Sequence, residues 1–170
     1  MLTSDHGDSL GEEARWGHSF TVFPEVLRIP LIIRLPPALR DGVETDLSRV
    51  SLATDITPTL YALLGEEPER LGTQFGAPLF VMPGTDTSWR KRESYLVASS
   101  YGPTYGLIRD NGRSLPIADA TYGREYAFDL RQGAAGRRIE ITDAERAANR
   151  RRIHDEVAAL AARYRFTPQP

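Results

Sequence analysis

The sequence contains no cysteine, and this absence removes three kinds of chemistry at once. It excludes disulfides, a zinc site with cysteine ligands and a cysteine-derived nucleophile within these 170 residues. The chain also lacks an excess of positive charge, since 21 basic residues stand against 23 acidic ones and the net charge is −2. This balance gives no indication of a nucleic-acid partner.

Long apolar runs are missing as well. The longest candidate, residues 29–35, is interrupted by Pro30 and Arg34 and falls far short of the ~20 residues that span a bilayer. The first residues lack the basic, apolar and small-residue regions of a signal peptide. No membrane span is therefore expected in this chain. Its residues do not assign a cellular location, and a full-length protein outside the cytoplasm or anchored to a membrane is compatible with them.

The first half of the chain has the pattern of an α/β structure. Residues 1–4 are typical of the end of a strand. Residues 26–35 form a β-branched run bounded by prolines, which predicts a buried strand of a parallel sheet. Another short strand is predicted at residues 50–52.

A helix is predicted after these strands. Thr57 is a plausible N-cap, Pro58 fits the first helical position and Gly65 fits the end. Its expected buried stripe consists of Ile56, Leu60, Leu63 and Leu64. Residues 66–92 are rich in glycine, proline and charge, and they predict a long surface connection.

The second half has a different pattern. Residues 94–100, 105–109 and 125–130 predict short strands, and Asp110-Asn111-Gly112 predicts a hairpin turn because Asn and Gly tolerate positive φ. Thr142 and Glu145 match a capping box at the start of a closing helix. The apolar residues of that helix repeat at helical spacing: Ile153, Val157, Leu160 and Tyr164. We therefore expect a small antiparallel sheet with one helix.

Asp5 and His6 are the first candidates for chemistry. A carboxylate oxygen and an imidazole nitrogen in adjacent positions suit a divalent cation. Gly7 permits the tight turn that aims two neighbouring side chains at one point. The triplet alone is also compatible with an ordinary turn, so its surroundings decide the interpretation.

Those surroundings form an ordered set of motifs. Thr3-Ser4-Asp5-His6-Gly7 is followed by Trp16-Gly17-His18, by Arg28-Ile29-Pro30-Leu31-Ile32, by Asp55-Ile56-Thr57-Pro58-Thr59-Leu60 and by Arg124-Glu125-Tyr126-Ala127-Phe128-Asp129-Leu130. This succession resembles the sulfatase family of the alkaline phosphatase superfamily. In that family a strand ends in Ser-Asp-His-Gly or Ser-Asp-Asn-Gly, and a Gly-His and a strand of the type Arg-Ile-Pro-Leu-Ile follow.

The resemblance implies a fold. Residues 1–90 would be the C-terminal part of an alkaline-phosphatase-like α/β domain, with a mostly parallel sheet and flanking helices. Residues 91–170 would form a small antiparallel-sheet subdomain that ends in a C-terminal helix.

The resemblance also implies roles for three residues. Asp5 and His6 would be ligands of a divalent metal cation, which could be Ca, Mg, Mn or Zn. His18 would contact the transferred sulfate or phosphate group or protonate the leaving oxygen, since imidazole titrates near neutrality. Asp8 and Glu12 could support the ligands or be solvated, and the solvated interpretation is preferred.

A complete active site is not expected in these residues. In the family, the nucleophile and further aspartate ligands lie in the N-terminal half. The nearest sequence here, Ser114-Leu115-Pro116-Ile117-Ala118, lacks the arginine of the nucleophile motif. We therefore expect a C-terminal portion of the enzyme that is inactive or nearly so alone. It would have the missing N-terminal half and a sulfate or phosphate ester as partners.

Three functions stay open at this point. The leading hypothesis is a metal-dependent, sulfatase-like hydrolase of sulfate, phosphate or phosphonate esters. A transferase of the phosphoethanolamine or phosphoglycerol type also shows Ser-Asp-His-Gly. A non-catalytic module that kept the fold and lost the chemistry is the third.

Overall fold

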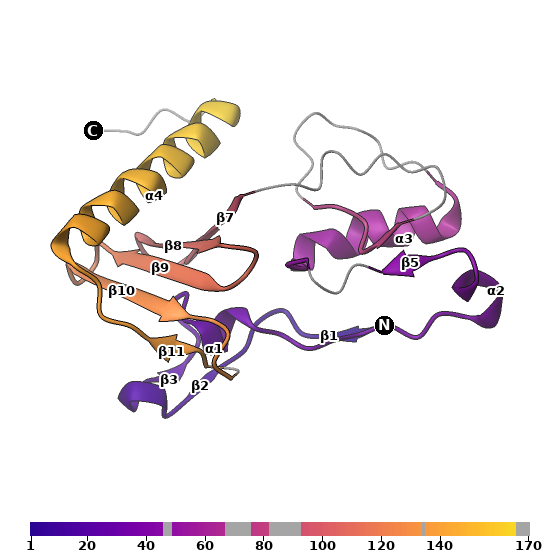
Figure 1. The fold of residues 1–170 in the computed structure, drawn as a ribbon, viewed down its shortest axis with the longest axis horizontal. Helices are drawn as coiled ribbons and strands as arrows, with labels where there is room; N and C mark the ends of the chain where they lie inside the picture. Colours follow the sequence, from indigo (N-terminus) through magenta and orange to yellow (C-terminus); the bar gives the residue numbers. More distant parts are fainter. Residues whose placement is uncertain (46–48, 67–75, 82–92, 134, 166–170) are drawn as a thin grey trace. The chain divides into compact units, whose positions relative to one another are not determined.

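The computed structural model describes residues 1–45, 49–66, 76–81, 93–133 and 135–165 (Figure 1). The chain divides into two compact units. Unit 1 comprises Met1–Thr3 and Leu31–Arg92, and unit 2 comprises Ser4–Pro30 and Glu93–Pro170. The division into domains 1–90 and 91–170 stays a prediction.

Unit 2 is built on a five-stranded antiparallel sheet with the strand order β11-β10-β9-β8-β7. Its strands are β7 (Ser94–Ala98), β8 (Thr104–Arg109), β9 (Ser114–Asp119), β10 (Arg124–Asp129) and β11 (Arg137–Arg138). The predicted strands at 94–100, 105–109 and 125–130 are confirmed as β7, β8 and β10. The hairpin turn is confirmed too, because Asp110, Asn111 and Gly112 all have positive φ between β8 and β9.

Strand β9 was not predicted, and a proline explains why. Pro116 lies in the middle of the strand and has no N–H to donate to a neighbour. The β8–β9 register accordingly passes from Gly106↔Ile117 to Arg109↔Ser114, whereas β10 pairs with β9 along its whole length. Burial on both faces holds the strand in place, since Leu115 and Ile117 are buried on one face and Pro116 is buried on the other.

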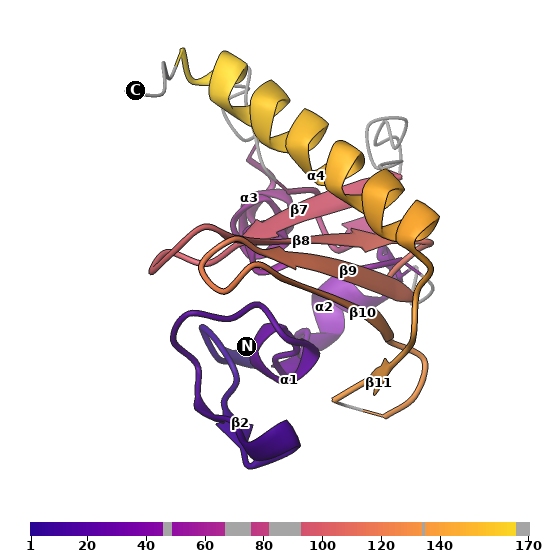
Figure 2. The same cartoon turned by 90° about the vertical axis from the view of Figure 1, so that its left-hand side faces the viewer.

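One face of the sheet is covered by helix α4 (Asp143–Arg163), as Figure 2 shows. The predicted capping box starts this helix. The Thr142 hydroxyl accepts the Glu145 N–H, and the Glu145 carboxylate accepts the Thr142 N–H at 2.7 Å. The hydrogen bonds that the Glu145 carboxylate accepts, first from the Thr142 N–H and then from the Thr142 hydroxyl, hold the pKa of Glu145 below its ordinary value. Of the predicted apolar stripe, Ile153 is buried and Tyr164 is 54% exposed.

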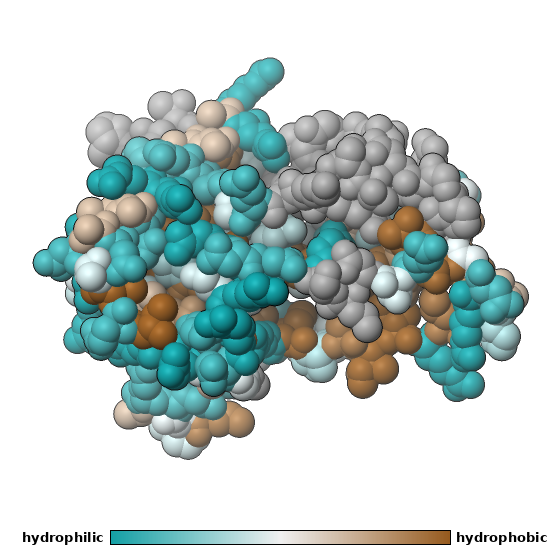
Figure 3. All heavy atoms as spheres, viewed as in Figure 1, coloured by the Kyte–Doolittle hydropathy of each residue, from teal (hydrophilic) through white to brown (hydrophobic). Residues whose placement is uncertain are grey.

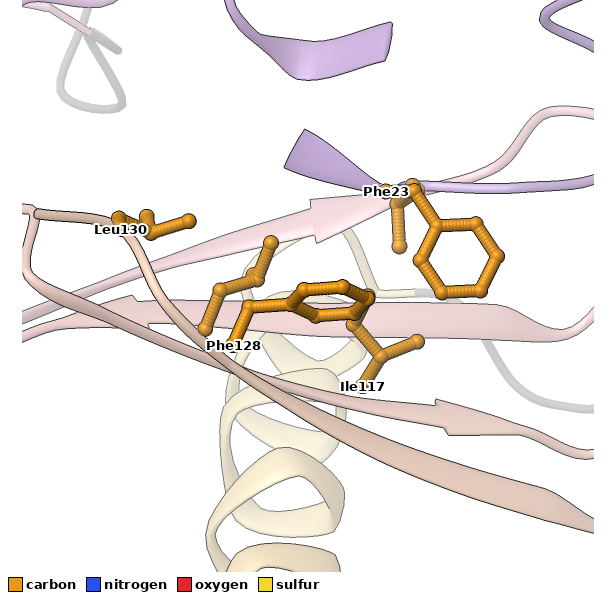
Figure 4. Packing of buried hydrophobic residues seen from close by; sticks show 6 residues of the cluster. Phe23, Ile117, Phe128 and Leu130 are labelled. Atoms are coloured by element: carbon orange, nitrogen blue, oxygen red, sulfur yellow. The ribbon is translucent and has the colours of Figure 1, made fainter. Parts of the chain in front are cut away.

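The other face carries residues 4–30 (Figure 2), whose elements are β2 (Ser9–Leu10), the 3₁₀ turn η1 (Glu12–Ala14), β3 (Trp16–Gly17) and α1 (Pro24–Leu27). Phe23 packs at a steep angle on Phe128 within the main apolar core, which also contains Ile117 and Leu130 (Figure 4). The Arg28 guanidinium donates to the carbonyl oxygens of Leu130 and Gly133. Residues 4–30 are thereby attached to the sheet at two points.

Unit 1 contains short strands and two helices: β1 (Leu2–Thr3), β4 (Leu31–Ile32), α2 (Pro37–Arg40), β5 (Glu44–Thr45), η2 (Ala53–Asp55), α3 (Ile56–Leu64) and β6 (Phe80–Val81). Strand β1 pairs with β4, and β5 pairs with β6. Among the described helices of either unit, none has the length and apolar character that crossing a membrane requires.

The prediction of a mostly parallel sheet is wrong for the described residues, in which every recorded strand pair is antiparallel. The apolar run 26–35 does not form one buried strand. Its first residues belong to α1, which ends at Leu27 with Arg28 as its C-cap, and only Leu31–Ile32 pair, antiparallel to β1. Ile32 is 60% exposed, and hydrophobic atoms reach the surface over β1 (Figure 3). The mixed α/β content, the antiparallel sheet and the C-terminal helix are confirmed.

The helix predicted over 57–65 is confirmed as α3, with Gly65 in the left-handed conformation at its end. The helix begins at Ile56 with Asp55 in the N-cap position, so the predictions of Thr57 as N-cap and Pro58 as first helical residue are wrong. The buried Asp55 carboxylate accepts the Ala77 N–H at 2.7 Å and pairs with Arg49 at 3.1 Å. The predicted buried stripe is wrong at Leu60 and Leu64, which are 46% and 77% exposed.

Two further predictions fall on this part of the chain. The segment predicted as a strand at 50–52 is not one, because Leu52 is the extended residue that precedes η2. Within the connection 66–92, Phe80–Val81 form β6, and residues 67–75 and 82–92 lie outside the described residues.

The end of β10 supplies a prediction for acid stability. Side-chain and backbone hydrogen bonds from Arg131 hold the pKa of Asp129 well below its ordinary value. Because the folded state has the lower pKa, this contribution is present above the unfolded value of ~3.9 and is lost as the pH falls below it. Asp129→Asn should therefore lower the urea midpoint at pH 6, and the difference from wild type should shrink towards pH 3. Asp155→Asn, at an exposed residue of α4, should change neither the urea midpoint nor its dependence on pH. A decrease in the midpoint of Asp129→Asn that is the same at pH 6 and pH 3 would contradict the stabilising role of the Arg131–Asp129 pair.

Candidate metal centre

A short hairpin brings the chemically important residues together. Ser9 pairs with Gly17 and Leu10 pairs with Trp16, and Gly11 turns the chain with a φ of 119°. Extending this antiparallel register by one residue places Asp8 opposite His18. Ten residues of sequence therefore separate two side chains that are neighbours in space.

The underside of the hairpin is anchored by a buried carboxylate. The Ser9 hydroxyl, which is fully buried, donates to Glu25 Oε1 at 2.8 Å, and Arg15 donates to the same oxygen at 2.9 Å. The Arg15 guanidinium also lies 3.8 Å from the centre of the Phe23 ring. This network connects the hairpin to α1 and to the apolar core.

Gly7 connects the other end of the site to α1. Its N–H donates to the Val26 carbonyl oxygen at 2.8 Å. A Cβ at this position would lie 2.1 Å from the Glu25 carbonyl oxygen, so only glycine permits the contact. The glycine predicted to permit a tight turn thus has a second role, because it lets the backbone carrying Asp5 and His6 lie directly against the helix.

The tautomer of His6 follows from its neighbours. His6 Nδ1 lies 3.0 Å from the Gly7 carbonyl oxygen, which can only accept a hydrogen bond. Nδ1 therefore carries the hydrogen, and in the neutral imidazole Nε2 keeps its lone pair. A backbone carbonyl that fixes the ring in this way is a common support for a metal-binding histidine.

Asp5 presents a second donor to the same point. Its Oδ2 lies 3.8 Å from His6 Nε2. Hydrogen bonds from its own N–H and from the His6 N–H, together with the nearby His6 ring, hold the pKa of Asp5 below its ordinary value. The side chain is 89% exposed and is therefore an accessible carboxylate at neutral pH.

These two donors fit a shared cation. Ligands bound at ~2.1 Å to one metal lie ~3.0–3.4 Å apart, which is only slightly closer than the pair here. When the His6 ring is neutral, its Nε2 lone pair and the Asp5 carboxylate oxygen face each other, and a cation between them would be attracted to both. An N,O donor set of this kind accommodates Zn, Mn or related divalent ions.

His18 lies beside this pair. Its ring stacks on that of His6, with centroids 3.8 Å apart and an angle of 29° between the planes. His18 Nδ1 also lies 2.8 Å from Asp8 Oδ1. One donor atom from each of His6, Asp8 and His18 can be chosen so that all lie within 4.8 Å of one another.

The structure thus brings the predicted residues Asp5, His6 and His18 to one place, and it adds Asp8. Asp8 was interpreted as solvated, and its contact with His18 was missed. The sequence carries no local signal of this contact, because Asp8 and His18 become neighbours only through the register of the Ser9–Gly17 hairpin. The structure does not test the roles of these residues as ligands or in catalysis.

Comparisons with known proteins find partial sequence similarity to three curated proteins. The chain is 39% identical over 72 residues to an uncharacterized sulfatase of Escherichia coli. It is 35% identical over 97 residues to an N-acetylglucosamine-6-O-sulfatase of Bacteroides thetaiotaomicron. It is also 39% identical over 71 residues to a low-salt glycan biosynthesis sulfotransferase of Haloferax volcanii.

Part of the chain is therefore similar in sequence to part of two proteins named as sulfatases and of one named as a sulfotransferase. The three matches cover 42%, 56% and 39% of this chain, but only 14%, 17% and 17% of the respective relatives. The chain therefore matches about one sixth of the length of each. No family model matches the sequence, and no solved structure matches it.

Proposed function

We propose that this chain supplies the Asp5–His6 metal ligands and the His18 contact of a metal-dependent sulfate ester hydrolase. The observation that carries the proposal is the facing pair of donors, Asp5 Oδ2 and His6 Nε2, beside the His18 ring. The similarity to proteins named sulfatases supports sulfate over phosphate as the first substrate to test. Phosphate and phosphonate esters share the tetrahedral oxyanion and are the alternative substrates.

Three residues of this chain would have separate roles in the reaction. His6, oriented by the Gly7 carbonyl, and Asp5, already a carboxylate, would hold the cation. Bound there, the cation supplies Lewis-acid stabilisation of charge on the ester oxygens. His18 would direct its Nε2 at the sulfate group or at the leaving oxygen, to which the ring can donate a proton from Nε2 when it is protonated on both nitrogens.

The nucleophile belongs to polypeptide outside these residues in this proposal. A catalytic metal site also needs more ligands than Asp5 and His6. The chain would therefore act only when joined to a segment that carries the nucleophile and further carboxylates, as the N-terminal half of the family's enzymes does.

The test is an assay of that joined polypeptide with 4-nitrophenyl sulfate and 4-nitrophenyl phosphate. We expect turnover of the sulfate, loss of turnover after treatment with a chelator, and recovery on addition of a divalent cation. Turnover of the phosphate alone would assign the chain to the phosphate ester branch. Turnover that survives complete chelation would contradict a metal-dependent mechanism.

The sulfotransferase among the relatives motivates one further arm of this assay. If the reaction in the presence of a sugar acceptor yields a sulfated sugar in place of free sulfate, the polypeptide is a transferase. Release of inorganic sulfate, measured by ion chromatography, supports the hydrolase.

A further inference from the structure

Asp8 has a contact that the proposed function does not use. Its Oδ1 lies 2.8 Å from His18 Nδ1, and both side chains are partly exposed, at 48% and 39%. An exposed aspartate with no partner would need no explanation. A carboxylate at hydrogen-bond distance from one particular ring nitrogen is a specific arrangement.

The hairpin makes this contact a consequence of the fold. The pairs Ser9↔Gly17 and Leu10↔Trp16 fix the two strands, and Asp8 and His18 are the next residues beyond the Ser9↔Gly17 pair. The buried Ser9 hydroxyl donates a hydrogen bond to Glu25. The strand that leads to Asp8 therefore cannot shift along its partner strand without breaking this bond. The contact is therefore supported by the backbone and by a buried side chain.

The contact also selects a tautomer. A carboxylate only accepts, so His18 Nδ1 must carry the hydrogen of this bond. In the neutral ring this leaves the lone pair on Nε2. Stacking on the His6 ring, 3.8 Å away, restricts the tilt of the ring as well. Asp8 and His6 together define which nitrogen of His18 is available and how its ring is oriented.

We infer that Asp8 is a positioning residue that holds His18 in the Nδ1–H tautomer and presents Nε2 to the ester. This inference rests on the proposed function for its purpose, but the tautomer itself is a property of this chain. Asp8 touches neither the ester nor the leaving group in this role. It acts through His18, and it stabilises positive charge on the imidazole when Nε2 also carries a proton.

The first experiment needs no activity. In the ¹⁵N-labelled chain, at a pH where imidazole is neutral, two-bond ¹H–¹⁵N spectra report the tautomer of each histidine. We expect Nδ1–H for His18 in the wild type and a mixture dominated by Nε2–H in Asp8→Ala. Asp8→Glu, which retains the carboxylate, should recover part of the Nδ1–H population, and His18→Gln assigns the signals.

His6 and His154 provide internal controls in the same spectra. His6 should keep its Nδ1–H tautomer in every Asp8 variant, because the Gly7 carbonyl fixes it. The side chain of His154 on α4 is 82% exposed, and its Nδ1 lies 3.5 Å from Asp155 Oδ1. Asp155→Ala should therefore leave the His18 signals unchanged. An Nε2–H tautomer for His18 in the wild type, or one that does not change in Asp8→Ala, would overturn the inference.

The second experiment separates positioning from metal binding in the joined polypeptide. Asp8→Asn should lower kcat about 10–100-fold, as loss of an orienting partner typically does, with the affinity for Zn²⁺ unchanged. A fall in Zn²⁺ affinity as large as that of His6→Ala would make Asp8 a ligand and overturn the positioning role. An unchanged kcat would overturn it too. If the wild-type polypeptide hydrolyses no ester, the proposed function fails, while the tautomer measurement still decides the inference.

Discussion

Asp5→Ala should lower kcat/KM for an aryl sulfate by at least about 1,000-fold in the joined polypeptide. The cation that Asp5 and His6 would share contributes several kcal/mol of charge stabilisation in the transition state, and ~1.4 kcal/mol corresponds to a factor of ten in rate. Asp5 Oδ2 is the carboxylate oxygen 3.8 Å from His6 Nε2, so its removal takes one donor from this pair. The measurement is steady-state kinetics with 4-nitrophenyl sulfate at saturating Zn²⁺ or Mn²⁺.

The fold should not change in this variant. The Asp5 side chain is 89% exposed, and its removal leaves the Gly7–Val26 and Ser9–Glu25 hydrogen bonds in place. The urea midpoint of the 170-residue chain should therefore equal that of the wild type. His6→Ala should lose activity to a similar extent, because in the proposed function the two residues would bind the same ion.

The second Asp-His pair of the chain is a matched control. Asp155 and His154 are adjacent and exposed on α4, and they have the same chemistry as Asp5 and His6. Asp155→Ala and His154→Ala should leave kcat/KM unchanged. Full activity of Asp5→Ala would refute the ligand assignment.

In the isolated chain, calorimetry should show only weak binding of Zn²⁺ or Mn²⁺, and tight stoichiometric binding there would show that the site is complete without further residues.

Gly7→Ala should damage both stability and activity. The added Cβ would lie 2.1 Å from the Glu25 carbonyl oxygen and 3.2 Å from its carbonyl carbon. Neither atom can rotate away because both belong to the backbone of α1. The segment that carries Asp5 and His6 must therefore move away from the helix and weaken the Gly7–Val26 hydrogen bond. Overpacking of this kind costs about 1–3 kcal/mol of unfolding free energy.

The same displacement should reduce catalysis in the joined polypeptide. A shift of ~1 Å in a positioned group can cost about 100-fold in rate, so kcat/KM of Gly7→Ala should fall by roughly that factor. Urea unfolding of the chain and kinetics of the joined polypeptide measure the two effects separately.

Gly42→Ala is the control for this substitution. A Cβ added at Gly42 would meet open space, with no heavy atom within 4 Å, and the residue has no positive φ. Its replacement should change the unfolding free energy by less than about 0.5 kcal/mol. A Gly7→Ala chain as stable as Gly42→Ala would show that Gly7 does not lie against α1.

The parts of the fold that could be predicted are those determined by neighbours in sequence. Thr142 and Glu145 cap α4 through residues three apart, and Asp110-Asn111-Gly112 turns the β8–β9 hairpin through its own backbone preferences. Gly65 ends α3 for the same reason. The direction of strand pairing was predicted wrongly in the first half, because it depends on which segment, distant in sequence, lies beside β4.

The candidate site divides in the same way. The sequence alone singled out Asp5, His6 and His18 as candidates, since adjacent metal-binding residue types and the motifs around them can be recognised without knowing the fold; their roles stay predictions. Only the tertiary structure showed that Asp8 contacts His18, that the rings of His6 and His18 stack, and that Gly7 lies against the backbone of Glu25. These contacts arise from strand register and from packing on α1, and residues ten or more positions apart carry no local signal of such proximity.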